Sequence, residues 1–112
     1  MSNELILIGD SIRMGYQATV HERLMGVNIW GPEANGGDSA NILSHLDEWV
    51  VAHAARLVHL NCGLHDLKKP FDSDQAQVGI DEYRRNVGQI FDAILATGAQ
   101  LVWASTTPVD ED

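Results

Sequence analysis

The sequence predicts an α/β domain built on a parallel sheet. Short apolar runs alternate along the chain with longer amphipathic stretches, and this alternation is typical of parallel strands joined by right-handed helical crossovers. The first run, at 4–8, is apolar on both faces, as in a central strand that is covered on both sides. The length of 112 residues and the 45% share of hydrophobic residues fit a single domain over 1–112.

The first half of the chain opens with a strand, a helix and a second strand. The strand at 4–8 ends at Gly9. Apolar residues then recur at helical spacing and predict a helix over 12–25, with Gly26 at its C-terminal end. A short β-rich segment at 27–30 is the second strand, and a polar, glycine-rich loop follows it.

The middle of the chain predicts a second helix and a third strand. Asp38 or Ser39 can cap this helix, because a side-chain oxygen at this position accepts a bond from the first free N–H groups. Its apolar residues fall on one face: Ile42, Leu43, Leu46, Trp49 and Val50. The segment 56–61 then reads as the third strand.

The last third predicts a loop at 64–72, a long helix at 74–97 and a fourth strand at 100–104. The apolar residues of the helix share one face: Ile80, Tyr83, Val87, Ile90 and Ile94. The resulting β-α-β-α-β-α-β order fits two strand orders, the flavodoxin-like 2-1-3-4 and the Rossmann-like 3-2-1-4, and the pattern alone does not choose between them.

Composition excludes several classes of protein. Seven Lys and Arg against sixteen Asp and Glu give a net charge of −9, which argues against a nucleic-acid partner. There is no apolar run long enough to span a membrane, and the segment 1–4 lacks the features of a signal peptide, so we expect a cytoplasmic location. The lone Cys62 excludes an internal disulfide. We expect neither a metal nor a cofactor, since no histidine pair or phosphate-loop pattern occurs.

Small and polar residues follow three of the predicted strands. They are Gly9-Asp10-Ser11, the segment 35–39 and the segment 61–66. Ligands of open parallel sheets bind beyond the carboxyl ends of the strands, so these three turns predict a site. Ser11 opens a helix there, where its backbone N–H can stabilise developing negative charge. The simpler interpretation is that Ser11 only caps the helix.

The same residues resemble the motifs of the SGNH, or GDSL, hydrolases. Gly9-Asp10-Ser11-Ile12 is similar to the first sequence block of this family, and Gly37-Asp38-Ser39 is similar to the second. Gly63-Leu64-His65-Asp66 is similar to the third, with His65 where the family has Asn. The resemblance implies a flavodoxin-like three-layer α/β/α fold, the strand order 2-1-3-4, and hydrolysis of a carboxylic ester.

The resemblance also implies roles for individual residues. Ser11 would be the nucleophile and would lend its backbone N–H to the oxyanion, with Gly37 lending a second N–H. His65 would be the third donor, since a neutral imidazole N–H can donate one hydrogen bond. Asp10 and Asp66 are secondary candidates: Asp10 as a residue that orients a neighbour, and Asp66 as an acceptor that fixes its loop.

The fourth block of the family, Asp-x-x-His, supplies the general base and does not occur in this sequence. We therefore expect a domain that is incomplete at its C-terminus, with the fifth strand and last helix missing. A Ser11–His65 dyad is one hypothesis for the missing base. The other histidines lie in predicted helices and strands, away from the strand ends: His21, His45, His53 and His59.

Three hypotheses of function follow. The first is a serine hydrolase that cleaves a small-molecule ester, with a short acyl group or an O-acetyl group on a carbohydrate, through an acyl-enzyme. The second is a non-catalytic binding module of the same fold, and the third is a flavodoxin-like binder of a nucleotide or flavin. A fourth strand with an open edge also predicts self-association.

Overall fold

The computed structural model describes residues 4–69 and 75–106. Its strands form one parallel sheet in the order β2-β1-β3-β4, which confirms the order 2-1-3-4. The strands are β1 (Glu4–Ile8), β2 (Asn28–Trp30), β3 (Leu57–Leu60) and β4 (Gln100–Trp103). Ile6 of β1 is in register with Trp30 on one side and Val58 on the other.

The central strand β1 is buried on both faces, as its apolar run predicts. Side chains alternate across a strand, so Leu5 and Leu7 face one side and Ile6 and Ile8 face the other. Leu5 and Leu7 belong to a small cluster beside the first helix, whereas Ile6 and Ile8 belong to the larger core on the opposite side.

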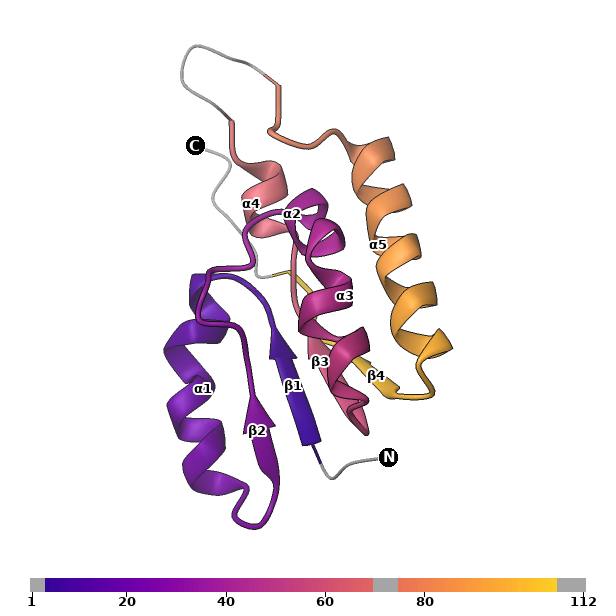
Figure 1. Ribbon diagram of the computed structural model, residues 1–112. Helices are drawn as coiled ribbons and strands as arrows, with labels where there is room; N and C mark the ends of the chain where they lie inside the picture. The colour runs from indigo at the N-terminus through magenta and orange to yellow at the C-terminus, as the bar shows by residue number, and fades with distance from the viewer. Residues whose placement is uncertain (1–3, 70–74, 107–112) are drawn as a thin grey trace.

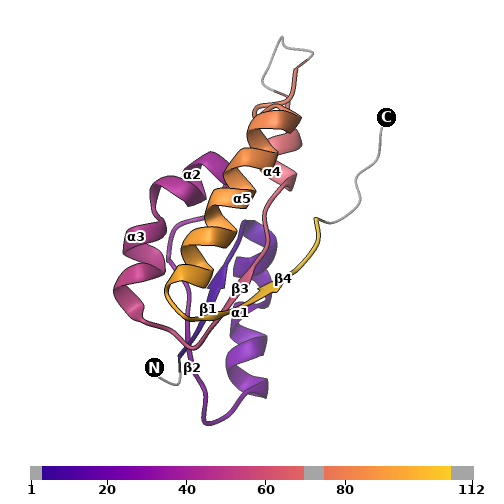
Figure 2. The same ribbon diagram turned by 90° about the vertical axis from the view of Figure 1, so that its right-hand side faces the viewer.

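Helices form a layer on each face of the sheet (Figure 1). The helix α1 (Ser11–Arg23) lies on one face, and the other carries α2 (Ser39–Ser44), α3 (Leu46–Trp49) and α5 (Ile80–Ala96). A view turned by 90° shows the sheet between these layers (Figure 2). The larger core fills the space under α2, α3 and α5, where Ile42, Trp49, Ile90 and Ile94 are buried.

The second predicted helix is broken into two at His45, where the sequence predicts one continuous element. The Ser44 hydroxyl donates to the carbonyl oxygen of Asn41 over 2.7 Å, and His45 Nδ1 lies 2.9 Å from the same oxygen. Side chains that bond to nearby carbonyls in this way compete with the helical ladder. After α3, the chain passes through a 3₁₀ turn at Val51–His53 and then through Ala54, whose backbone is in the left-handed conformation, before β3 begins.

The segment between β3 and α5 differs from the predicted loop and helix. A short helix, α4 (Leu64–Leu67), lies where the sequence predicts a loop. The long helix begins at Ile80 rather than at residue 74. The N–H of Val78 donates to the carbonyl oxygen of Asp66, and the N–H of Gln77 donates to that of Lys68. These bonds keep the segment before Ile80 out of the helix.

One part of the sheet has little helical cover. Beside α1, a groove of about 510 Å³ lies over β3 and is lined by apolar and aromatic side chains that include Leu7, Tyr16 and Leu57.

Within residues 4–69 and 75–106, β4 pairs with β3 alone, and its Val102 side chain is 44% exposed. In the same described residues, no helix is both long and apolar enough to cross a bilayer.

Candidate active site

The loops that follow β1, β2 and β3 meet at one edge of the sheet. The N–H of Gly36 donates to the carbonyl oxygen of Gly9 over 2.8 Å, and the N–H of Asn61 donates to that of Ile8 over 3.0 Å. A Cβ atom on Gly36 would come within 2.5 Å of the Gly9 oxygen, so this approach requires a glycine. The motif residues therefore gather where ligands bind in open parallel sheets.

Ser11 is the first residue of α1 and is exposed to solvent. With Leu64, His65 and Lys68 it lines a hollow of about 330 Å³, which we call the Ser11 hollow. The first N–H groups of a helix have no partner inside the helix, and the peptide dipoles concentrate positive partial charge there. The Ser11 hydroxyl thus lies where a developing oxyanion is stabilised.

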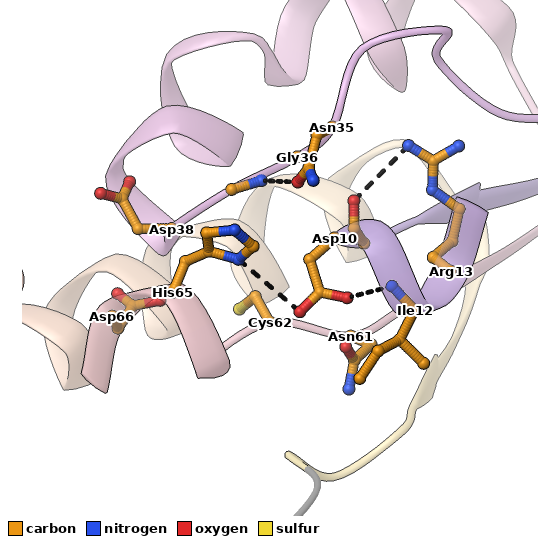
Figure 3. A network of polar contacts seen from close by, with 12 residues as sticks. Asp10, Ile12, Arg13, Asn35, Gly36, Asp38, Asn61, Cys62, His65 and Asp66 are labelled. Carbon is orange, nitrogen blue, oxygen red and sulfur yellow. Dashed lines mark hydrogen bonds and ion pairs between the residues drawn. The ribbon is translucent and has the colours of Figure 1, made fainter. Parts of the chain in front are cut away.

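Asp10 is buried directly beside Ser11, with 1% of the residue exposed. Its Oδ1 accepts a hydrogen bond from the N–H of Ile12 over 2.9 Å and so caps α1. Its Oδ2 lies 3.8 Å from Nδ1 of His65 (Figure 3). Among the described residues, neither of these two buried atoms has a hydrogen-bond partner. The structure thus brings Asp10, Ser11 and His65 together at one end of the sheet.

The backbone N–H of Gly37 is already engaged. It donates to Oδ1 of Asn35 over 2.8 Å, in a bond that is exposed to solvent. Asn35 therefore occupies the position that an oxyanion would take at this donor. A substrate oxygen can reach the Gly37 N–H only after the Asn35 side chain has moved.

Asp66 is buried but faces α2 rather than the Ser11 hollow. Its two oxygens accept from the N–H of Ser39 over 3.0 and 3.1 Å, and its Oδ2 also accepts from the Ser39 hydroxyl over 2.5 Å. Asn86 of α5 donates to the same hydroxyl. Burial raises the pKa of the Asp66 carboxyl, and the two kinds of Ser39 hydrogen bond oppose this rise. Asp66 thus fixes the start of α2 against α4 and α5.

Arg13 is a buried residue that sequence reasoning missed. Its guanidinium donates to the carbonyl oxygens of Pro32 and Ala34 over 2.9 and 2.8 Å, and to Gln17 over 2.8 Å. Burial lowers the pKa of Arg13 from its ordinary value, while Tyr16 and Asp10 oppose this change. In the sequence, the only signal is Gln17 one helical turn later, because the other acceptors are backbone atoms.

The remaining histidines do not line the Ser11 hollow. His53 Nδ1 lies 2.9 Å from Oε1 of Glu4, and burial lowers the pKa of His59 within β3.

Burial also raises the pKa of the Cys62 thiol to about 12, so this side chain is a poor nucleophile. In the part of the chain that the structure describes, no three metal-binding side chains gather.

Comparisons with known proteins find solved structures that share this fold. Neither a protein-family model nor a curated protein matches the sequence. A GDSL-like lipase from Bacteroides thetaiotaomicron matches the structure with a TM-score of 0.74 at 18% identity, over 90% of this chain and 47% of its own. An acetyl xylan esterase matches with a TM-score of 0.74 at 15% identity, over 89% of this chain and 56% of its own.

A psychrotrophic esterase from Pseudoalteromonas sp. also matches, with a TM-score of 0.68 at 14% identity, over 91% of this chain and 58% of its own. At these identities the likeness concerns the fold. The chain shares its fold with part of a GDSL-like lipase and of two esterases, and it spans about half the length of these solved structures.

Proposed function

We propose that this chain carries the nucleophile of a serine hydrolase that cleaves carboxylic esters. The observation that carries this proposal is the position of Ser11. It is exposed, it is the first residue of a helix that follows a buried strand, and it lines a hollow in a fold shared with esterases. A hydroxyl in this position has a positive helix end beside it and room for a substrate in front of it.

The reaction proceeds through an acyl-enzyme. Ser11 Oγ attacks the carbonyl carbon of the ester as its proton passes to a base, and the carbonyl oxygen becomes an oxyanion beside the Ser11 N–H. The bond to the alcohol then breaks, and the alcohol leaves with a proton. Water attacks the acyl-enzyme in the same way, so that the acid is released and the Ser11 hydroxyl is restored.

The substrates that we propose are small esters, with a short acyl group or an O-acetyl group on a carbohydrate. The hollow of about 330 Å³ is of the size that small-molecule sites have. One of the matching structures is an acetyl xylan esterase, and its name supports an O-acetyl group on a carbohydrate.

The alternative is a binding module of the same fold that does not catalyse. One observation favours it: the Asn35 side chain occupies the Gly37 N–H. A site whose oxyanion donor is already engaged stabilises a transition state poorly. The test of the first proposal therefore also decides between the two.

A fluorophosphonate probe provides this test, because it reacts with activated serines. We expect the probe to label the wild-type chain at Ser11, as located by peptide mass spectrometry, and Ser11→Ala to abolish the label. Ser44→Ala, which removes another exposed hydroxyl, is the matched control and should label like the wild type. Absence of a label at Ser11 would reject the hydrolase and favour the binding module.

We also propose that the chain self-associates through the open edge of β4. A parallel edge strand presents unpaired N–H and C=O groups to any strand that can pair with it. Here β4 also exposes two large apolar side chains, Val102 and Trp103. No charged residue lies within β4 to discourage such pairing.

A further inference from the structure

The contact between Asp10 and His65 joins two buried polar atoms that have no other partner among the described residues. Asp10 Oδ2 and His65 Nδ1 are 3.8 Å apart, slightly farther than a hydrogen bond. Figure 3 shows the carboxylate between the His65 ring and the N–H of Ile12, one oxygen toward each. Catalytic hydrogen bonds are often long in the absence of substrate and tighten only when substrate binds.

From this geometry we propose that His65 is the general base for Ser11 and that Asp10 is the residue that positions it. Because a carboxylate oxygen can only accept, the proton of a neutral His65 lies on Nδ1, facing Asp10. Nε2 then carries the free lone pair. This proposal rests on the proposed ester hydrolysis and assigns the base to a side chain that lines the same hollow as Ser11.

The charged groups around His65 leave Asp10 as its carboxylate partner. Lys68 lines the same hollow and carries no acceptor. The carboxylate of Asp38 is engaged by the N–H of Asn41 and by the side chain of Gln77. Asp66 is engaged by Ser39, as described above. Among these carboxylates, only Asp10 Oδ2 faces the imidazole without another partner.

One ring atom, Nε2 of His65, takes up the proton and later returns it. As Ser11 Oγ bonds to the ester carbon, Nε2 of His65 takes the hydroxyl proton, and the resulting imidazolium faces the Asp10 carboxylate through Nδ1–H. When the C–O bond to the alcohol breaks, Nε2–H gives its proton to the leaving oxygen. Water is activated in the same way in the second half of the reaction.

This role differs from that of an oxyanion donor at position 65. A resting ring with its proton on Nδ1 cannot donate from Nε2, whereas an Asn side chain can donate and cannot act as a base. His65→Asn therefore separates the two roles, since it removes the base and restores the side chain that the SGNH family has here.

The experiment measures the rate of fluorophosphonate labelling at Ser11. We expect His65→Asn to slow labelling at least about 10²-fold, the smaller end of what a general base contributes. Asp10→Asn keeps an oxygen to cap α1 but loses the carboxylate, and we expect at least about a tenfold loss. His21→Asn, an exposed position in α1, is the matched control and should label at the wild-type rate.

A second measurement needs no activity. Long-range ¹H–¹⁵N spectra of the imidazole nitrogens report which one bears the proton. We expect the Nδ1–H form of His65 in the wild type, and loss of this preference in Asp10→Asn.

The outcomes separate the two proposals. Labelling of His65→Asn at the wild-type rate would overturn the base and leave the hydrolase standing. An Nε2–H ring in the wild type, or a tautomer unchanged by Asp10→Asn, would overturn the role of Asp10. Absence of any label at Ser11 in the wild type would overturn both the hydrolase and the base. If His65→Asn fails to fold by circular dichroism, the spectra of the wild type still decide the tautomer.

Discussion

The guanidinium of Arg13 donates to the carbonyl oxygen of Ala34 over 2.8 Å and thereby joins the first helix to the loop after β2. The same side chain reaches Pro32, and the N–H of Gly36 bonds to Gly9 beside it. A cation that is 99% buried would be costly without such partners. The position of the Gly36-Gly37 turn relative to Ser11 therefore depends on a residue outside the sequence motifs.

Arg13→Met should destabilise the fold. The substitution keeps much of the apolar volume but leaves the carbonyl oxygens of Pro32 and Ala34 without their donor. We expect the free energy of unfolding to fall by an amount on the order of 3 kcal/mol, because hydrogen bonds to a charged group contribute about 1.5–3 kcal/mol each. Urea unfolding measures the change. Arg84→Met, an exposed site on α5, is the control, and an equal effect of both variants would contradict this account.

Gly63→Ala should also destabilise the chain. Gly63 has a φ of +137°, and an added Cβ would collide with Thr106 Oγ1 and lie 2.9 Å from the hydroxyl of Tyr83. We expect a cost of about 1–3 kcal/mol for the strained backbone alone. Gly88→Ala is the opposite case. Gly88 lies inside α5, where an added Cβ meets open space, and the substitution should raise the free energy of unfolding by about 0.8 kcal/mol. Thermal or urea unfolding should move in opposite directions for the two variants.

The buried Asp66 should make stability depend on pH. Its folded-state pKa lies above the ordinary value of 3.8, chiefly because of desolvation. The folded chain therefore binds this proton more tightly than the unfolded chain does. The resulting stability is full below pH 3.8 and is lost as pH rises through the folded-state pKa.

Asp66→Asn should remove this part of the pH dependence. Urea unfolding at a series of pH values from acid to neutral measures it, with Asp92→Asn at an exposed site of α5 as the control. If the free energy of unfolding changes with pH by the same slope in Asp66→Asn as in the wild type, the slope comes from other groups.

Asn35→Ala should increase reactivity at Ser11. The substitution frees the Gly37 N–H for an oxyanion, and removal of one such donor costs about 10²–10³-fold in comparable sites. We expect faster fluorophosphonate labelling, by up to about 10²-fold. Asn28→Ala, at an exposed position in β2, is the control. Unchanged or slower labelling would mean that the Gly37 N–H does not take part.

Val102→Lys should reduce self-association. A lysine on the open edge strand opposes pairing with a second strand. We expect the wild type to show a concentration-dependent increase in mass by sedimentation velocity or light scattering, and Val102→Lys to stay monomeric. Val51→Lys makes the same change at an exposed site outside β4. A wild type that remains monomeric at high concentration would reject the edge contact.

The periodicity of apolar residues was enough to predict the strands, the long helices and their order along the chain. Periodicity reports which faces are buried, and in this fold the burial of Leu5, Ile6, Leu7 and Ile8 follows the pattern directly. The strand order required the family resemblance, since two topologies share the same pattern.

Local bonding explains what the pattern missed. The break at His45 depends on side chains that bond to the Asn41 carbonyl, and apolar spacing does not register such bonds. The start of α5 depends on backbone bonds to Asp66 and Lys68. Among the candidate site residues, the motifs predict Ser11 and His65, and these remain predictions. The burial of Arg13 and the contact of Asp10 with His65 depend on how distant segments meet.

The burial of Cys62 at the end of β3 provides a reporter of local opening. It is the chain's only cysteine, and its pKa of about 12 leaves almost no thiolate at neutral pH while the fold is closed. Alkylation therefore requires that the end of β3 separate from its neighbours, where the thiol regains ordinary reactivity. The rate of alkylation of the unmodified protein then reports local opening of the loop after β3, which is bonded to the end of β1 just before the Ser11 motif.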